Sequence, residues 1–207
     1  MRRILILLLF FLIPSGCAYL KTKKTPYDKG PRPDSLKAEA VIDVFGKDRL
    51  KGRAIIILKA PDKFRIEVAG AFLQTAMAIA SNGSVIETYS NGETRAYFPV
   101  QGINPYPFTP QELVSALLLA EIPGKGNDYR ITLDSMGFPV EMKKLNGQDV
   151  LFTIGYSDFR TVNGFYLPFS VVISYGYERV EIRYAAITTG HDEADSAFRL
   201  NIAGPAQ

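Results

Sequence analysis

Few residues in this sequence could carry out catalysis or bind a metal. The 207-residue chain has one cysteine, Cys17, and one histidine, His191. A zinc site draws its ligands mainly from Cys, His and carboxylates, and a Cys–His nucleophile needs both residues in one pocket. His191 precedes Asp192 and Glu193 near the carboxyl end, where a surface loop is the simplest interpretation. No nucleophile-elbow, Walker or dinucleotide-binding pattern occurs at a strand-to-helix junction, so we expect no enzyme, no catalytic residue and no metal.

The amino end resembles a bacterial lipoprotein signal. Arg2 and Arg3 precede an unbroken apolar run, Ile4–Ile13, which is too short to span a bilayer. Small residues follow directly before Cys17, although Pro14 stands where that pattern prefers Leu. The resemblance implies that residues 1–16 are removed and that Cys17 is acylated on its thiol and on its new amino group. The alternative is an ordinary secretory signal in which the cysteine occurs by chance.

Charge and composition divide the rest of the chain. The sequence has 24 basic and 21 acidic side chains, and removal of Arg2 and Arg3 brings this balance close to zero. A net charge near zero gives no reason to expect binding to nucleic acid. Residues 17–34 are rich in Lys and Pro, which predicts an extended, lipidated tether. We expect one domain over residues 35–190 and a polar tail over 191–207.

The pattern of the domain predicts about eleven strands in hairpin order. Phe64, Ile66 and Val68 alternate with charged residues, which is the two-residue period of a strand with one dry face. Asn-Gly pairs at 82–83, 91–92, 146–147 and 163–164 are strong hairpin signals, because both residues tolerate positive φ. Residues 36–45 are predicted as the first strand, although their composition would also suit a helix.

One turn is unusually apolar. Between the strands predicted at 63–69 and 75–81, Phe72 and Leu73 stand side by side where turns usually carry Gly, Asn, Asp, Ser or Pro. Either these side chains fold back under the sheet, or they meet an apolar partner outside it.

A single helix is predicted between the sixth and seventh strands. Thr109, Pro110 and Glu112 form a capping-box pattern with proline at the first helical position. We expect the helix to run to about Glu121, before Pro123-Gly124. It is apolar on most of its circumference, which indicates burial on more than one side, or one side on the sheet and another on a removable ligand.

One short helix cannot cover eleven strands. We therefore predict a mainly β fold, a strongly curved, unclosed antiparallel β-barrel with the helix as a lid over its mouth.

This order of elements, with the segments RLKGRAIIILKAPDKFRIEVAGAFLQTAMAI and TPQELVSALL, resembles the LolA/LolB superfamily over residues 36–189. The resemblance implies an unclosed barrel with a helical lid and an apolar cavity that accepts the acyl chains of lipoproteins. It also implies a protruding apolar residue on the turn after the third strand, where Phe72 or Leu73 stands here. The helical part is shorter than is typical of LolB.

The same resemblance implies a location and a set of partners. Cys17 favours the lipid-anchored LolB side over the soluble LolA side, and Ala18 is not the Asp that retains many such lipoproteins at the inner membrane. We expect an outer-membrane protein facing the periplasm, a monomer, which receives lipoproteins from a LolA-like carrier and contacts the inner leaflet. Its only cofactor would be the covalent lipid, with acyl chains as ligand. The alternative function is a lipid-anchored interaction or envelope-sensing protein with the same barrel.

Two groups of apolar residues are candidates for the ligand site. The alternative for each residue is a filled core. The cavity candidates are Ile56, Leu58, Phe64, Ile66, Val68, Phe169, Val171, Ile173 and Ile182, and the lid candidates are Leu113, Leu117 and Leu118.

Overall fold

The computed structural model describes residues 31–46, 49–70, 74–99, 106–120 and 128–200. These residues form eleven strands, one α-helix and one short 3-10 helix. The strands are β1 (Ser35–Phe45), β2 (Leu50–Lys59), β3 (Lys63–Ala69), β4 (Thr75–Asn82), β5 (Ile86–Ser90), β6 (Glu93–Tyr97), β7 (Tyr129–Leu133), β8 (Pro139–Asn146), β9 (Asp149–Val162), β10 (Phe165–Tyr175) and β11 (Glu178–Thr189). The helices are α2 (Pro110–Leu117) and η3 (Asp195–Phe198). Within this part of the chain, no helix is long and apolar enough to cross a bilayer.

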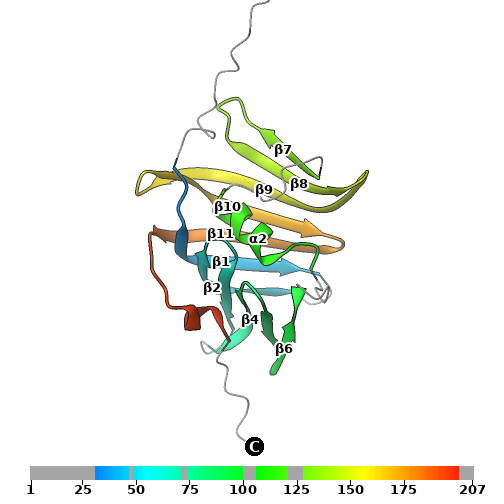
Figure 1. Cartoon of the computed structure of the whole chain (residues 1–207), viewed down its shortest axis with the longest axis vertical. Helices are drawn as coiled ribbons and strands as arrows, with labels where there is room; N and C mark the ends of the chain where they lie inside the picture. Colours follow the sequence, from blue (N-terminus) through cyan, green and yellow to red (C-terminus); the bar gives the residue numbers. More distant parts are fainter. Residues whose placement is uncertain (1–30, 47–48, 71–73, 100–105, 121–127, 201–207) are drawn as a thin grey trace, which may run out of the picture.

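All eleven strands belong to one antiparallel sheet, which curves around α2 (Figure 1). Its order is β6-β5-β4-β3-β2-β1-β11-β10-β9-β8-β7, so β6 and β7 are the two edges and the sheet does not close. Every neighbouring pair is a sequence hairpin except β1 and β11, where Ile42 lies opposite Ile182. The predicted fold class, an unclosed antiparallel barrel with one helix, is confirmed.

The Asn-Gly pairs form hairpin turns as predicted. Asn91 and Gly92 join β5 to β6 with φ values of 52° and 82°, and Asn163 and Gly164 join β9 to β10 with 50° and 83°. Both residues of each pair occupy the left-handed region that such a two-residue turn requires.

Residues 35–45 form a strand and not a helix. One residue, Asp43, departs from the alternation of buried and exposed side chains. Asp43 points away from the helix-covered face, yet it is only 3% exposed. Arg49 and Lys51 cover it, with nitrogen–oxygen distances of 3.3 and 3.8 Å. A buried carboxylate needs such partners because an uncompensated charge is costly to bury.

Helix α2 begins where the sequence predicts. The Thr109 side chain accepts a hydrogen bond from the Glu112 amide at 3.2 Å, and the Glu112 carboxylate accepts one from the Thr109 amide at 2.7 Å. This is the complete capping box, and it satisfies two amides that a helix start otherwise leaves unpaired.

The helix ends at Leu117, before the predicted Glu121. The amide of Ala120 donates to the Ser115 carbonyl at 2.8 Å, and that of Leu119 to the Ala116 carbonyl at 3.3 Å. This pair of bonds is a Schellman motif, with Leu119 at φ 53° in the position that glycine usually occupies. Leu119 is only 3% exposed, so burial of its side chain favours a turn that its sequence does not announce.

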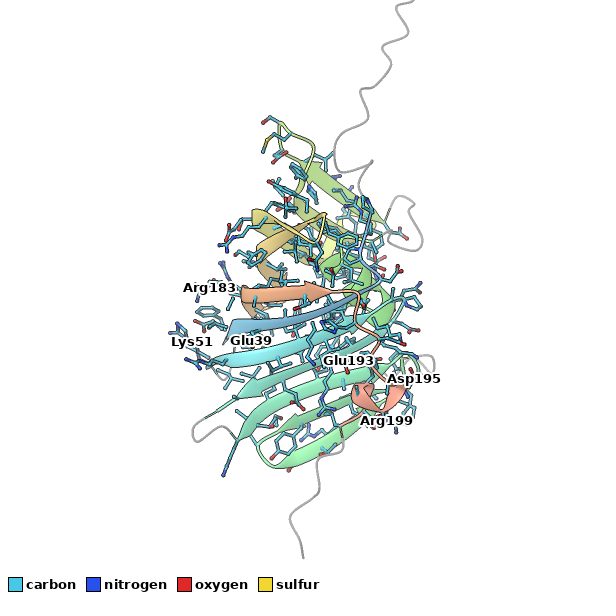
Figure 2. The ribbon with its side chains drawn as sticks, turned by 90° about the vertical axis from the view of Figure 1, so that its left-hand side faces the viewer. Glu39, Lys51, Arg183, Glu193, Asp195 and Arg199 are labelled. Atoms are coloured by element: carbon cyan, nitrogen blue, oxygen red, sulfur yellow. The ribbon has the colours of Figure 1, made fainter. Side chains whose placement is uncertain are left out.

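Residues 190–200, which we call the C-terminal strap, cross the outer face of the sheet, opposite α2 (Figure 2). Ion pairs hold them: Lys59–Asp192 at 2.8 Å, Lys63–Asp195 at 2.7 Å and Arg199–Glu87 at 3.0 Å. Helix η3 contacts β3 and β4, where its Phe198 is fully buried. Leu200 packs on Ala78 and Ala80, whose small side chains leave room for it.

Candidate ligand cavity

The inner face of the sheet, the face that α2 covers, contains a cavity of about 340 Å³. Strands β1, β3, β4, β5, β6, β10 and β11 form its walls, and the helix side contributes Leu113. Its wall is mainly apolar and aromatic, as is usual for sites of small apolar ligands. The apolar and aromatic lining residues include Ile42, Val44, Ile66, Met77, Ile79, Tyr89, Tyr97, Tyr106, Phe108, Ile173, Tyr175, Val180 and Ile182.

Strand register arranges this wall in layers. An inner layer joins Ile42 to Ile182 and Ile66 to Ile79, each pair directly opposed on neighbouring strands. Closer to the strand ends, Val44 lies opposite Val180. The cavity therefore runs along the strands from the middle of the sheet towards one of its ends.

We assign the mouth of the cavity to that end, because lining residues at the β10–β11 turn and at the β5–β6 turn are partly or fully exposed there. Tyr175 and Glu178 pair across the β10–β11 turn, and both side chains are partly exposed. Because β1, β3, β5 and β10 all run in the same direction, the β3–β4 turn lies at this end too. Its flanks close through a hydrogen bond from the Gly70 amide to the Gln74 carbonyl at 2.8 Å. Phe72 and Leu73, the predicted membrane-contact residues, lie outside the described residues, as does Cys17.

The twelve candidate residues divide into two groups. Four of them line the cavity: Ile66, Ile173, Ile182 and, from the helix, Leu113. The other eight belong to the packed core of the inner face, which fills the space between α2 and the sheet. These eight are Ile56, Leu58, Phe64, Val68, Phe169, Val171, Leu117 and Leu118.

A partly buried polar cluster binds α2 to β7 and β8. Lys144 lies 2.5 Å from the Glu112 carboxylate, and the Tyr129 hydroxyl donates a hydrogen bond to the same oxygen. Burial raises the pKa of Glu112, but the hydrogen bonds from Lys144, Tyr129 and Thr109 outweigh it and leave the pKa below its ordinary value. Burial, with the neighbouring Glu112 carboxylate, raises the pKa of Tyr129. At neutral pH the cluster is therefore a charged pair with a hydroxyl donor.

Aromatic rings separate the packed part of the inner face from the cavity. Phe108 makes edge-to-face contacts with Phe152 on the packed side and with Tyr175 at the mouth, at centroid distances of 6.1 and 6.0 Å. Tyr106 stacks on Phe108 at 5.4 Å, and burial raises the pKa of Tyr106 to about 12. Its hydroxyl is therefore protonated at neutral pH.

Sequence reasoning missed much of the cavity wall. Met77 and Ile79 alternate with alanines along β4, a pattern that marks one large-residue face, and this face borders the cavity. The four tyrosines of the wall come from four separate segments, and no local pattern places Tyr89, Tyr97, Tyr106 and Tyr175 around one space.

Taken together, an open antiparallel sheet, an internal capped helix and an apolar cavity under it define a half-barrel with a ligand-sized hollow. Comparison of the sequence with protein-family models gives no match, and comparison with curated proteins gives none either. Comparison with solved structures does give matches.

Three solved structures share the fold of this chain. The chain is similar to a LolA superfamily protein from Nitrosomonas europaea, with a TM-score of 0.52, 14% identity and coverage of 86% of this chain and 95% of that one. It is also similar to a putative outer membrane lipoprotein-sorting protein domain from Vibrio parahaemolyticus. That comparison gives a TM-score of 0.57 and 10% identity, and it covers 81% of this chain and 90% of that one. A DUF1329 family protein from Desulfovibrio piger gives a TM-score of 0.58 and 9% identity, with coverage of 84% of this chain and 93% of that one. At these identities the likeness establishes the fold.

Proposed function

We propose that this protein is a lipid-anchored acceptor, which binds acyl chains of lipoproteins and inserts the lipoproteins into the outer membrane. One observation carries the proposal: the inner face holds an apolar cavity whose mouth lies at the same end of the sheet as the β3–β4 turn. The fold, shared with a domain described as lipoprotein-sorting, supports the same class of ligand.

Physical chemistry explains why such an acceptor is needed. Three acyl chains expose about fifty methylenes, and their burial is worth on the order of 40 kcal/mol at about 0.8 kcal/mol each. A lipoprotein cannot cross an aqueous compartment with these chains bare. An apolar cavity shields a chain without covalent chemistry, so the proposal requires no catalytic residue, metal or further cofactor.

In this proposal, the anchor and the apolar turn act together. Acylation of Cys17 would hold the domain at the inner leaflet of the outer membrane, as a monomer facing the periplasm. A soluble LolA-like carrier would supply the lipoprotein. Phe72 and Leu73 would contact the bilayer beside the cavity mouth, so that a released chain passes directly into the membrane.

The binding step is tested by native mass spectrometry with a triacylated lipoprotein and the chain from residue 17 onward carrying Cys17→Ser. We expect a one-to-one complex that requires the acyl chains. Ile79→Trp, which fills the cavity wall, should abolish the complex. Ile57→Trp is the matched control, because Ile57 lies partly exposed on the outer face of β2 and lines neither the cavity nor the outer groove. A complex that survives Ile79→Trp unchanged would place the chains elsewhere.

The delivery step is tested in cells. The double variant Phe72→Glu, Leu73→Glu, as the only copy, should accumulate at normal levels and fail to deliver lipoproteins. Normal lipoprotein sorting in these cells would refute the assigned role of this turn.

The second candidate function is a lipid-anchored interaction or envelope-sensing protein. A groove on the outer face favours it, lined by Glu39, Arg53, Ile55, Glu67 and Ala185 among others, with an apolar floor and charged edges. A specific protein partner, together with no binding of acyl chains, would support this alternative over the acceptor.

A further inference from the structure

We infer that the cavity accepts a single acyl chain, of about eleven carbons, and that the other chains of a multi-chain ligand stay outside it. This inference rests on the proposed function and specifies how much of the ligand the site buries. It concerns the number of chains and the length of chain that the protein shields.

The cavity volume limits the ligand. A methylene takes up about the same space as a water molecule in the liquid, about 30 Å³. The cavity of about 340 Å³ therefore has room for about eleven such groups. Three chains with about fifty methylenes would need on the order of 1,500 Å³, several times the space that is present.

Among the described residues, the rest of the inner face offers no further room. Leu58 and Phe64 are fully buried, and Phe152 is 1% exposed, so the core between α2 and the sheet is closed to solvent. Protein interiors pack as densely as organic crystals, and a second chain would have to displace side chains already in contact.

The lid is also held in place. Glu112 is bound by Lys144 and Tyr129 from β8 and β7, and the Tyr156 hydroxyl donates to the Ala116 carbonyl at 3.2 Å. Moving α2 to enlarge the cavity would break these bonds while their groups are partly or fully buried. The hollow part of the inner face can therefore widen only at its open end.

The shape of the cavity sets the orientation of the chain. Its inner layer, with Ile42, Ile66 and Ile182, is apolar and buried. Its mouth carries Tyr175 and Glu178. A chain that enters methyl end first places its polar end between these residues, and carbons beyond about the eleventh remain at the mouth.

The test is a chain-length series. Peptides carrying one acyl chain of eight, ten, twelve, fourteen or sixteen carbons are titrated, below their micelle concentrations, into the Cys17→Ser chain from residue 17 onward. Each buried methylene contributes about 0.8 kcal/mol, a factor of about four in affinity. We expect affinity to rise by about this factor per carbon and to level off between ten and twelve carbons.

A side chain that fills the cavity should lower the chain length at which affinity levels off. Ile79→Trp should move the plateau to fewer carbons or remove binding, and Ile57→Trp on the outer face should leave the plateau unchanged. The same peptide with three chains should bind one-to-one, within about tenfold of the single-chain form, because two chains would stay outside.

The outcomes separate this inference from the function on which it rests. Affinity that keeps rising to sixteen carbons, two or more single-chain peptides per protein, or more than a hundredfold gain from three chains would overturn the single-chain inference. Each of these results would still support an acyl-chain acceptor. Absence of binding by every peptide would overturn both.

Discussion

The two parts of the inner face differ although the same kind of strand forms them. Around Leu58, Phe64 and Phe152, side chains from the sheet meet α2 and leave almost no exposed surface. Around Met77, Ile79 and the mouth of the cavity, the inward-pointing side chains of the strands border an open volume of about 340 Å³.

The helix explains this difference. Helix α2 contacts β3 and is bound through Glu112 to Lys144 and Tyr129, and its apolar residues share one core with Leu58 and Phe64. Towards the other end of the strands the sheet keeps its apolar wall, and no helix or strand among the described residues fills the space in front of it. An inward apolar residue is therefore part of the core or of a binding site according to what lies across from it.

The largest effect expected from this comparison comes from deleting side chains of similar size in the two halves. Leu58→Ala should lower the free energy of unfolding by about 3–5 kcal/mol, because it leaves a hole in a closed core. Met77→Ala should lower it by only about 1 kcal/mol, because the half-buried Met77 already borders empty space. Urea unfolding of both variants measures this, and equal losses would mean that the cavity wall is packed as tightly as the core.

The hollow half is supported from outside by the C-terminal strap. Phe198→Ala should lower the free energy of unfolding by about 2–3 kcal/mol, less than a central core deletion, because the strap can detach before the sheet unfolds. Hydrogen exchange should rise first in β4, which carries Ala78 and Ala80 against the strap and Ile79 against the cavity.

Asp192→Asn is the control for this strap variant. The Asp192 side chain is 97% exposed in its ion pair with Lys59, and such exposed pairs contribute little to the stability of the folded state. A larger effect of Asp192→Asn than of Phe198→Ala would show that charge, and not burial, holds the strap.

The attachment of the lid should depend on pH. The pKa of Glu112 lies below its ordinary value of 4.5, so its ion pair stabilises the fold above that value and is lost as the pH falls through the folded-state pKa. Glu112→Gln keeps a capping side chain but removes the charge, and should lower the free energy of unfolding by about 1–2 kcal/mol at pH 7.

The difference between wild type and Glu112→Gln should shrink as the pH falls below 4.5 and through the folded-state pKa of Glu112. Thermal unfolding at several pH values measures it. A difference that stays constant with pH would show that the carboxylate charge does not hold the lid.

The smallest expected effect concerns two tyrosines of the packed half. The Tyr184 hydroxyl is buried without a hydrogen-bond partner among the described residues, and burial raises its pKa. Tyr184→Phe should therefore raise the free energy of unfolding by up to about 1 kcal/mol. Tyr156→Phe is the matched control and should lower it by about 1 kcal/mol, because the Tyr156 hydroxyl donates to Ala116. Destabilisation by both substitutions would indicate a partner for Tyr184.

Much of the fold could be predicted because its signals are local. Alternation over two residues defines strands, Asn-Gly pairs define four hairpin turns, and Thr109 with Glu112 defines the start of α2. The end of α2 could not be predicted in the same way. Its Schellman motif depends on the burial of Leu119, which is decided by packing against distant strands.

The sequence by itself determined which side chains of each strand point towards α2, since the period of a strand assigns every second residue to one face. Only the tertiary structure decided which of these residues fill a core and which line a cavity. Ile66 and Phe64 are two positions apart on the same face of β3, yet Ile66 borders the cavity and Phe64 lies in the packed half. The reason is physical: alternation specifies the direction of a side chain, whereas packing depends on what the rest of the chain places opposite it.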